Sequence, residues 1–179
     1  MKRNSTLKIK YAIIAALVIS SLPLMADEHN ESNHIKACEF FLESGKIGEF
    51  LKSQLIETGC NGQSDESTIR FCADLKYVSG TEINEILLPY YVKRVSKEHC
   101  TQAGEYYSSV KGKEFLKFAF DYAANPDSAY VSDDVILAQE QFQKTEASDS
   151  INRLASSTAL IRLVVKKLHE HISEHSNMH

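Results

Sequence analysis

Apolar residues recur three and four positions apart along most of the chain, and this spacing is the strongest constraint on its fold. Two such stripes are Ile47, Phe50, Leu51 and Leu55, and Phe115, Phe118 and Ala119. Glycine and proline, which interrupt helices, number only seven and three in 179 residues. Because an amphipathic helix places every third or fourth residue on one face, these stripes predict helices throughout.

Polar residues mark where these helices begin. Ser79 and Glu82 have the spacing of a capping box, in which each side chain bonds the other residue's backbone. Single caps are predicted at Ser96, Ser109 and Ser132. Gly45 is expected to end the first helix, and one long helix is expected over residues 150–174. The sequence therefore predicts an all-α bundle of about six to eight short helices, built from helical hairpins.

The first 26 residues have the pattern of a cleavable secretory signal peptide. Four basic residues and no acid occur in the first ten, and an apolar run follows from Tyr11 to Met25. Pro23 and the small Ala26 close this run. A positive start, a short apolar segment and a small residue at the cut are typical of such signals, and a membrane anchor needs about 20 apolar residues. We expect cleavage after residue 26, no membrane span in the mature chain, and a periplasmic or secreted location.

The mature chain would be a single acidic domain. Removing the signal leaves residues 27–179, a length that suits one core, with an ordered part at about 33–170 and a His-rich tail at 169–179. The signal holds four of the 20 basic residues and none of the 24 acids, so 16 basic against 24 acidic residues leave a net charge of −8. This balance argues against nucleic acid as a partner. It fits a protein partner in the cell envelope, although many exported proteins are simply acidic.

Four cysteines in an exported chain predict two disulfides. Cys38, Cys60, Cys72 and Cys100 allow three pairings. Loop length favours Cys60–Cys72, with Cys38–Cys100 tying the first helix to a later one, and the other two pairings stay open. Zinc is the alternative use, but the chain has no C-x-x-C pair and the spacings fit no zinc finger.

The stretch Leu88 to Leu116 contains L-P-Y-Y-V-K-R-V-S-K-E and then E-Y-Y-S-S-V-K-G-K-E-F-L. It resembles the bacterial domain of unknown function 2059, a family of exported helical proteins. The residues that fit the family pattern are Pro89, Tyr91, Ser96, Glu98, Tyr106, Tyr107, Ser109 and Gly112. Val110 stands where that family usually has Pro, and the cysteines and the His-rich tail lie outside the pattern. The resemblance implies a helical fold with a helix–turn–helix joint, and no known reaction.

Tyrosines are concentrated in the same stretch. Tyr90, Tyr91, Tyr106 and Tyr107 fit either packing in the core or an exposed binding surface, because tyrosine anchors many interfaces. We take them as the candidate partner-binding residues.

Histidines near the two ends form candidate metal sites. His171 and His175 lie one helical turn apart, a spacing that can bind zinc, copper or nickel, and His179 can join them if the helix continues. The alternative is a solvated helix end, where histidine favours the helix dipole. After cleavage behind Ala26, His29 becomes the third residue, and a free amine with a third-position histidine binds Cu(II) or Ni(II) in a square plane.

No pattern for nucleophilic catalysis stands out. Many serines lie at predicted caps, and His99, the only histidine far from both ends, fits a surface or cap position better than a base. We therefore expect a non-enzymatic helical domain that binds a protein or another envelope component, for example an inhibitor or immunity protein. The alternatives are a periplasmic metal-binding protein that uses its His-rich ends, and a hydrolase whose residues converge only in three dimensions.

Overall fold

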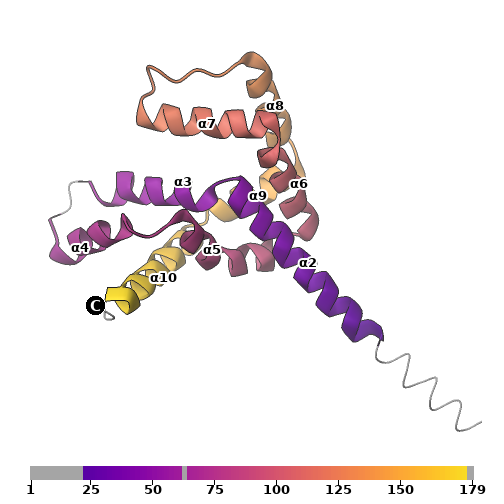
Figure 1. The fold of residues 1–179 in the computed structure, drawn as a ribbon, viewed down its shortest axis with the longest axis horizontal. Coiled ribbons are helices and arrows are strands. Elements are labelled where there is room, and N and C mark those ends of the chain that lie inside the picture. Colours follow the sequence, from indigo (N-terminus) through magenta and orange to yellow (C-terminus); the bar gives the residue numbers. More distant parts are fainter. Residues whose placement is uncertain (1–21, 62–63, 177–179) are drawn as a thin grey trace, which may run out of the picture.

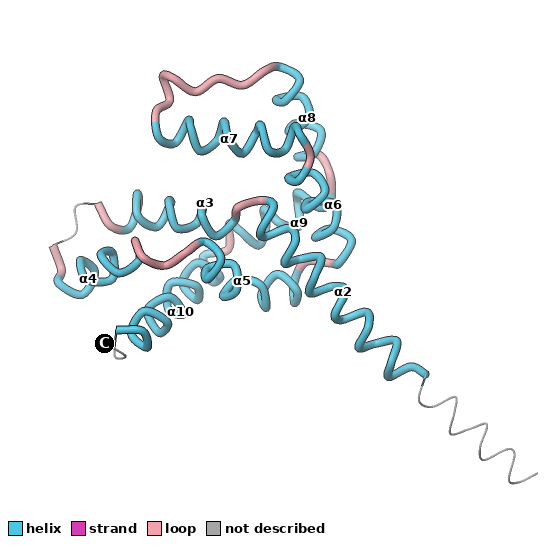
Figure 2. The backbone as a smooth tube through the Cα atoms, in the orientation of Figure 1, coloured by secondary structure: helices cyan, strands magenta, loops and turns pink. Residues whose placement is uncertain are grey.

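The computed structural model describes residues 22–61 and 64–176, with side chains from residue 30 to residue 174 (Figures 1 and 2). All regular structure in this part is helical, so the predicted all-α fold is confirmed. The elements are α2 (Leu22–Ser44), α3 (Ile47–Gln54), the π-helix η1 (Leu55–Gly59), α4 (Glu66–Leu75), α5 (Gly80–Arg94), α6 (Lys97–Ser108), α7 (Val110–Ala124), α8 (Asp133–Gln143), α9 (Glu146–Ala155) and α10 (Thr158–Ser176). None of these helices is both long and apolar enough to cross a membrane. The predicted signal at residues 1–26 lies mostly outside the described residues.

The predicted caps lie at helix starts. The hydroxyl of Ser79 accepts from the Glu82 backbone, and the Glu82 carboxylate accepts from the Ser79 backbone, which completes a capping box for α5. The hydroxyls of Ser96 and Ser109 each accept a hydrogen bond from the backbone three residues further on, and so cap α6 and α7. Ser132 occupies the cap position of α8, but its hydroxyl donates to the Asp134 carboxylate instead of accepting from the backbone.

The prediction of one helix over residues 150–174 is wrong. Helix α9 ends at Ala155 and α10 begins at Thr158. Between them the Ser156 hydroxyl donates to the Asn152 carbonyl at 2.7 Å, and the Ser157 hydroxyl accepts from the Leu160 backbone at 3.4 Å. Serine side chains compete with the helical backbone for hydrogen bonds, so a serine pair can end one helix and begin the next.

The core forms where α2 packs against α5 and α6. Cys38, Phe41 and Leu42 of α2 are almost fully buried there, facing Tyr91 of α5 and Ala103 of α6. Two disulfides reinforce the fold: Cys38–Cys100 joins α2 to α6, and Cys60–Cys72 joins the end of η1 to α4. The disulfide-linked bundle expected from the sequence is therefore present, with the pairing that loop length favoured.

Helices α3 and α5 approach each other closely through two glycines. A Cβ atom on Gly48 would collide with the Gly80 carbonyl oxygen. The Gly48 amide donates to the Asn84 side chain at 2.8 Å, and the amide of Asn84 donates to the Leu42 carbonyl at 3.3 Å. This buried network fixes the position of α3 relative to α2 and α5.

Helices α7 and α8 form a hairpin that packs on itself and on α6. Its α7 arm runs beside α3 in the view of Figure 1, and the two helices meet where the rings of Phe50 and Phe120 make an edge-to-face contact with centroids 6.3 Å apart. The apolar faces of α3, α7 and α10 converge around these two rings and leave a pocket between them.

Candidate functional site

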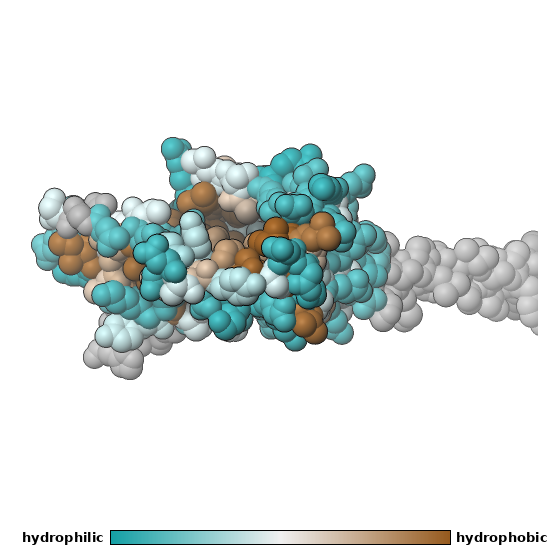
Figure 3. All heavy atoms as spheres, turned by 90° about the horizontal axis from the view of Figure 1, so that it is seen from above, coloured by the Kyte–Doolittle hydropathy of each residue, from teal (hydrophilic) through white to brown (hydrophobic). Residues whose placement is uncertain are grey.

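An apolar pocket of about 400 Å³ lies between α3, α7, α9 and α10. Helix α3 contributes Ile47, Phe50, Leu51 and Gln54, and α7 contributes Phe115, Leu116, Ala119 and Phe120. The other wall comes from α9 and α10, with Ile151, Asn152, Ala155, Leu160, Ile161 and Val164. Among the described residues, no charged side chain lines it. In the space-filling view, apolar residues gather around a hollow in the surface of the body (Figure 3).

The pocket is built from the helical stripes that the sequence displays. Its residues recur three and four apart on each helix, so one face of α3, α7 and α10 turns toward the same space. These faces are only partly covered: Phe50 is 44% exposed and Ile161 is 41% exposed. An apolar stripe of this kind usually packs into a core. The structure places these residues around a pocket of the size that ligand-binding sites usually have.

Two of the predicted binding tyrosines form the floor of the pocket. Tyr91 is 2% exposed and Tyr107 is half-buried, and both rings pack on Phe41. Burial, with a smaller effect of Tyr107 nearby, raises the pKa of Tyr91 to about 12. Neither phenol has a hydrogen-bond partner among the described residues. Both are therefore neutral groups that are able to donate a hydrogen bond.

The other two predicted tyrosines lie away from the pocket. Tyr106 stacks on Phe142 with ring centroids 4.3 Å apart, and its hydroxyl is buried without a partner among the described residues. Tyr90 is half-buried and packs against the core cluster. The four tyrosines therefore do not form one exposed surface.

Lys46 lies at the rim of the pocket, in the turn between α2 and α3. Helix α2 ends at Ser44, directly before Gly45, as the sequence predicts. The residue after Gly45, Lys46, has a left-handed backbone (φ 49°). A non-glycine residue in this conformation is strained. The Lys46 Nζ lies 5.8 Å from the ring centroid of Phe120, a lining residue, and Lys46 makes no ion pair within the described part of the chain. An exposed cation is therefore held beside an uncharged pocket.

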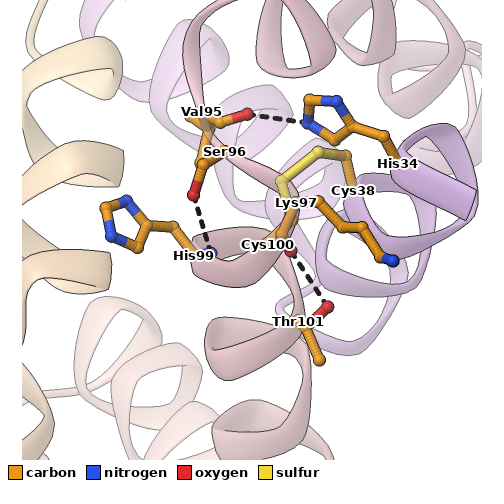
Figure 4. The surroundings of a disulfide bond; sticks show 8 residues. All are labelled: His34, Cys38, Val95, Ser96, Lys97, His99, Cys100 and Thr101. Carbon is orange, nitrogen blue, oxygen red and sulfur yellow. Dashed lines mark hydrogen bonds between the residues drawn. A yellow bond between two sulfur atoms is a disulfide. The ribbon is translucent and has the colours of Figure 1, made fainter. Parts of the chain in front are cut away.

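The Cys38–Cys100 disulfide has one histidine beside it (Figure 4). His34 Nε2 lies 2.8 Å from the Val95 carbonyl oxygen, and its ring and both sulfur atoms lie within 4.8 Å of one another. A cysteine binds a metal ion as a thiolate, but the sulfur atoms of Cys38 and Cys100 are bonded to each other. They are therefore not metal ligands. The ring of His99 lies on the other side of α6 in this view and contacts Glu146 at 3.9 Å. This histidine pair therefore forms no shared site.

The C-terminal histidines that the structure describes have partners within the fold. His171 Nε2 lies 3.1 Å from a carboxylate oxygen of Glu82, the capping-box residue of α5. The hydrogen bonds from Ser79, and then that with His171, lower the pKa of Glu82 to about 2. The ring of His169 stacks on Phe71 at 4.0 Å. Of the remaining predicted metal ligands, the side chains of His29 and His175 and the whole of His179 lie outside the described part.

A second hollow, of about 730 Å³, lies between α4 and α10. Its polar groups are engaged with their own helices: Asp65 caps α4, and Arg70 pairs with Glu66. The Ser173 hydroxyl donates to the His169 backbone carbonyl at 2.7 Å, so it does not bond the His169 ring. No nucleophile–base pair is formed among the residues that line this hollow.

Comparison with known proteins found no family model, no curated protein and no solved structure that matches the chain. The resemblance to the domain of unknown function 2059 stays a prediction that rests on residues 88–116. The geometry of the apolar pocket is therefore the main structural guide to function.

Proposed function

We propose that this chain is an exported, non-enzymatic binding protein of the bacterial periplasm, and that it holds an apolar envelope component in the apolar pocket. The observation that carries this proposal is the convergence of partly exposed apolar faces from α3, α7 and α10 on a space without a charged lining residue. Each methylene group that a ligand buries there gains about 0.8 kcal/mol. A domain of this kind needs no catalytic group.

Two further features support the proposal. The predicted signal peptide and the two disulfides fit a compartment outside the cytoplasm. Apart from the Tyr91 and Tyr107 phenols, the polar lining residues are Gln54 and Asn152, and both of these are exposed. An apolar interior with a few polar groups at its opening is typical of pockets that orient an amphiphile.

Filling the pocket tests this function. We expect mature protein to bind a neutral, polarity-sensitive dye such as Nile red saturably, with a blue-shifted emission. Ala119→Phe adds a ring inside the pocket and is expected to lower this binding at least tenfold. Ala123→Phe, at an exposed position one turn further along α7, is the matched control and should bind as the wild type does.

Circular dichroism and the melting temperature of both variants check that the fold is retained. Dye binding that does not saturate, or that is equally strong in the Ala119→Phe variant, would contradict the proposed function.

A further inference from the structure

We infer that the natural ligand of the apolar pocket is a single acyl chain with an anionic head, a fatty-acid carboxylate, and that Lys46 binds the head. This inference rests on the proposed function and specifies its ligand. It depends on three features: the size of the pocket, the contact between two of its walls, and the position of one cation.

The pocket volume of about 400 Å³ lies toward the lower end of the range for ligand-binding pockets. Phe50 on α3 and Phe120 on α7 both line the pocket, and their rings contact each other edge to face with centroids 6.3 Å apart. This contact joins two walls of the pocket. It favours a slender acyl chain over a helix, which must seat anchors from two turns.

Lys46 is the cation at the opening. It flanks Gly45 and Ile47, which line the pocket, and its ammonium group lies over the ring of Phe120. No carboxylate of the described residues pairs with it, and no acid lines the pocket. An acyl chain in the pocket can therefore present a carboxylate to an ammonium group that has no competing partner among the described residues.

The backbone conformation of Lys46 supports a binding role for this lysine. The left-handed conformation suits glycine and is strained for lysine. Gly45 directly precedes it, so the chain carries the lysine at the one place in this turn where glycine would be more stable. Strain of this kind is typical of positions that serve binding.

The net negative charge of the protein does not oppose this ligand at short range. Charges beyond about 8 Å are largely screened at physiological ionic strength. The carboxylate would meet the nearby ammonium group of Lys46, which forms no ion pair among the described residues. The neutral Tyr91 and Tyr107 phenols add no negative charge to the pocket.

Three ligands that differ only in their heads test the inference by calorimetry on delipidated mature protein. They are dodecanoate, dodecanol and dodecyltrimethylammonium, each below its micelle concentration. We expect dodecanoate to bind tightest. Lys46→Met should weaken dodecanoate about threefold to fivefold, the usual effect of an exposed ion pair, and leave dodecanol unchanged. Lys113→Met, an exposed lysine on α7 outside the pocket, is the matched control.

A second variant separates binding from folding. Lys46→Gly should weaken dodecanoate as Lys46→Met does, yet raise the melting temperature by about 2–4 °C because it relieves the strained backbone. Equal affinities for all three heads, with binding still lost in Ala119→Phe, would overturn this inference and leave the proposed function standing. Binding of none of the three would overturn both. A dimer whose dissociation is required for dodecanoate to bind would show that a second copy occupies the pocket, and would also overturn it.

Discussion

The Cys38–Cys100 disulfide is expected to contribute more to stability than Cys60–Cys72. A disulfide stabilises mainly by restricting the unfolded chain, and the effect grows with the length of the closed loop. The sequence separations are 62 and 12 residues, which correspond to about 4.3 and about 2.9 kcal/mol at 25 °C. Burial adds to the difference, because Cys38 and Cys100 are fully buried in the α2–α6 interface.

Two double variants measure this difference. Cys38→Ala with Cys100→Ala should lose about 4–5 kcal/mol of unfolding free energy, and Cys60→Ala with Cys72→Ala about 3 kcal/mol. Urea unfolding followed by far-ultraviolet circular dichroism gives both values. The slope m of the unfolding free energy against urea concentration is fitted separately for each variant, because an unfolded chain without the cross-link exposes more surface. If the Cys60–Cys72 variant lost as much stability as the other, the loop-length argument would be refuted for this protein.

Two further predictions concern α5 and its contacts. Glu82 has a folded pKa of about 2 against an ordinary 4.5, so its contribution is complete above about pH 4.5 and is lost as the pH falls toward 2. Between about pH 4.5 and pH 2 the wild type is expected to lose about 1 kcal/mol of unfolding free energy, and Glu82→Gln should remove this pH dependence. Identical pH profiles of stability in the two proteins would count against this role of Glu82. Gly48→Ala should cost about 3 kcal/mol in urea unfolding because the new methyl group meets the Gly80 backbone. Gly59→Ala, which meets nothing within 4 Å, should stay within about 0.5 kcal/mol, and equal losses in the two variants would refute the close-approach argument.

Local signals made much of the fold predictable. A cap depends on residues three positions apart, so the box at Ser79 and Glu82 and the caps at Ser96 and Ser109 could be recognised from the sequence. Loop length favoured the disulfide pairing that the structure has, although it left the other two pairings open. The break at residues 156 and 157 was not predicted from the sequence. Apolar residues occur on both sides of the serine pair, and this pattern resembles one continuous helix.

The site depended on information that the sequence does not contain. An apolar stripe shows that one face of a helix avoids water, but not what covers that face. Phe50, Leu116 and Ile161 have the same spacing as core residues, yet they surround a pocket. The left-handed backbone of Lys46 also had no signal in the sequence, because lysine rarely adopts this conformation.

The nested arrangement of the disulfides has a consequence for the proposed export of the chain. Cys60–Cys72 lies entirely inside the loop that Cys38–Cys100 closes. A chain that enters an oxidising compartment from its N-terminus presents Cys38 first and Cys60 next, and these two are not partners. Oxidation in order of arrival therefore gives a wrong bond, which thiol exchange must undo after Cys100 arrives. The yield of correctly bonded protein should thus depend on a disulfide isomerase more than on an oxidase.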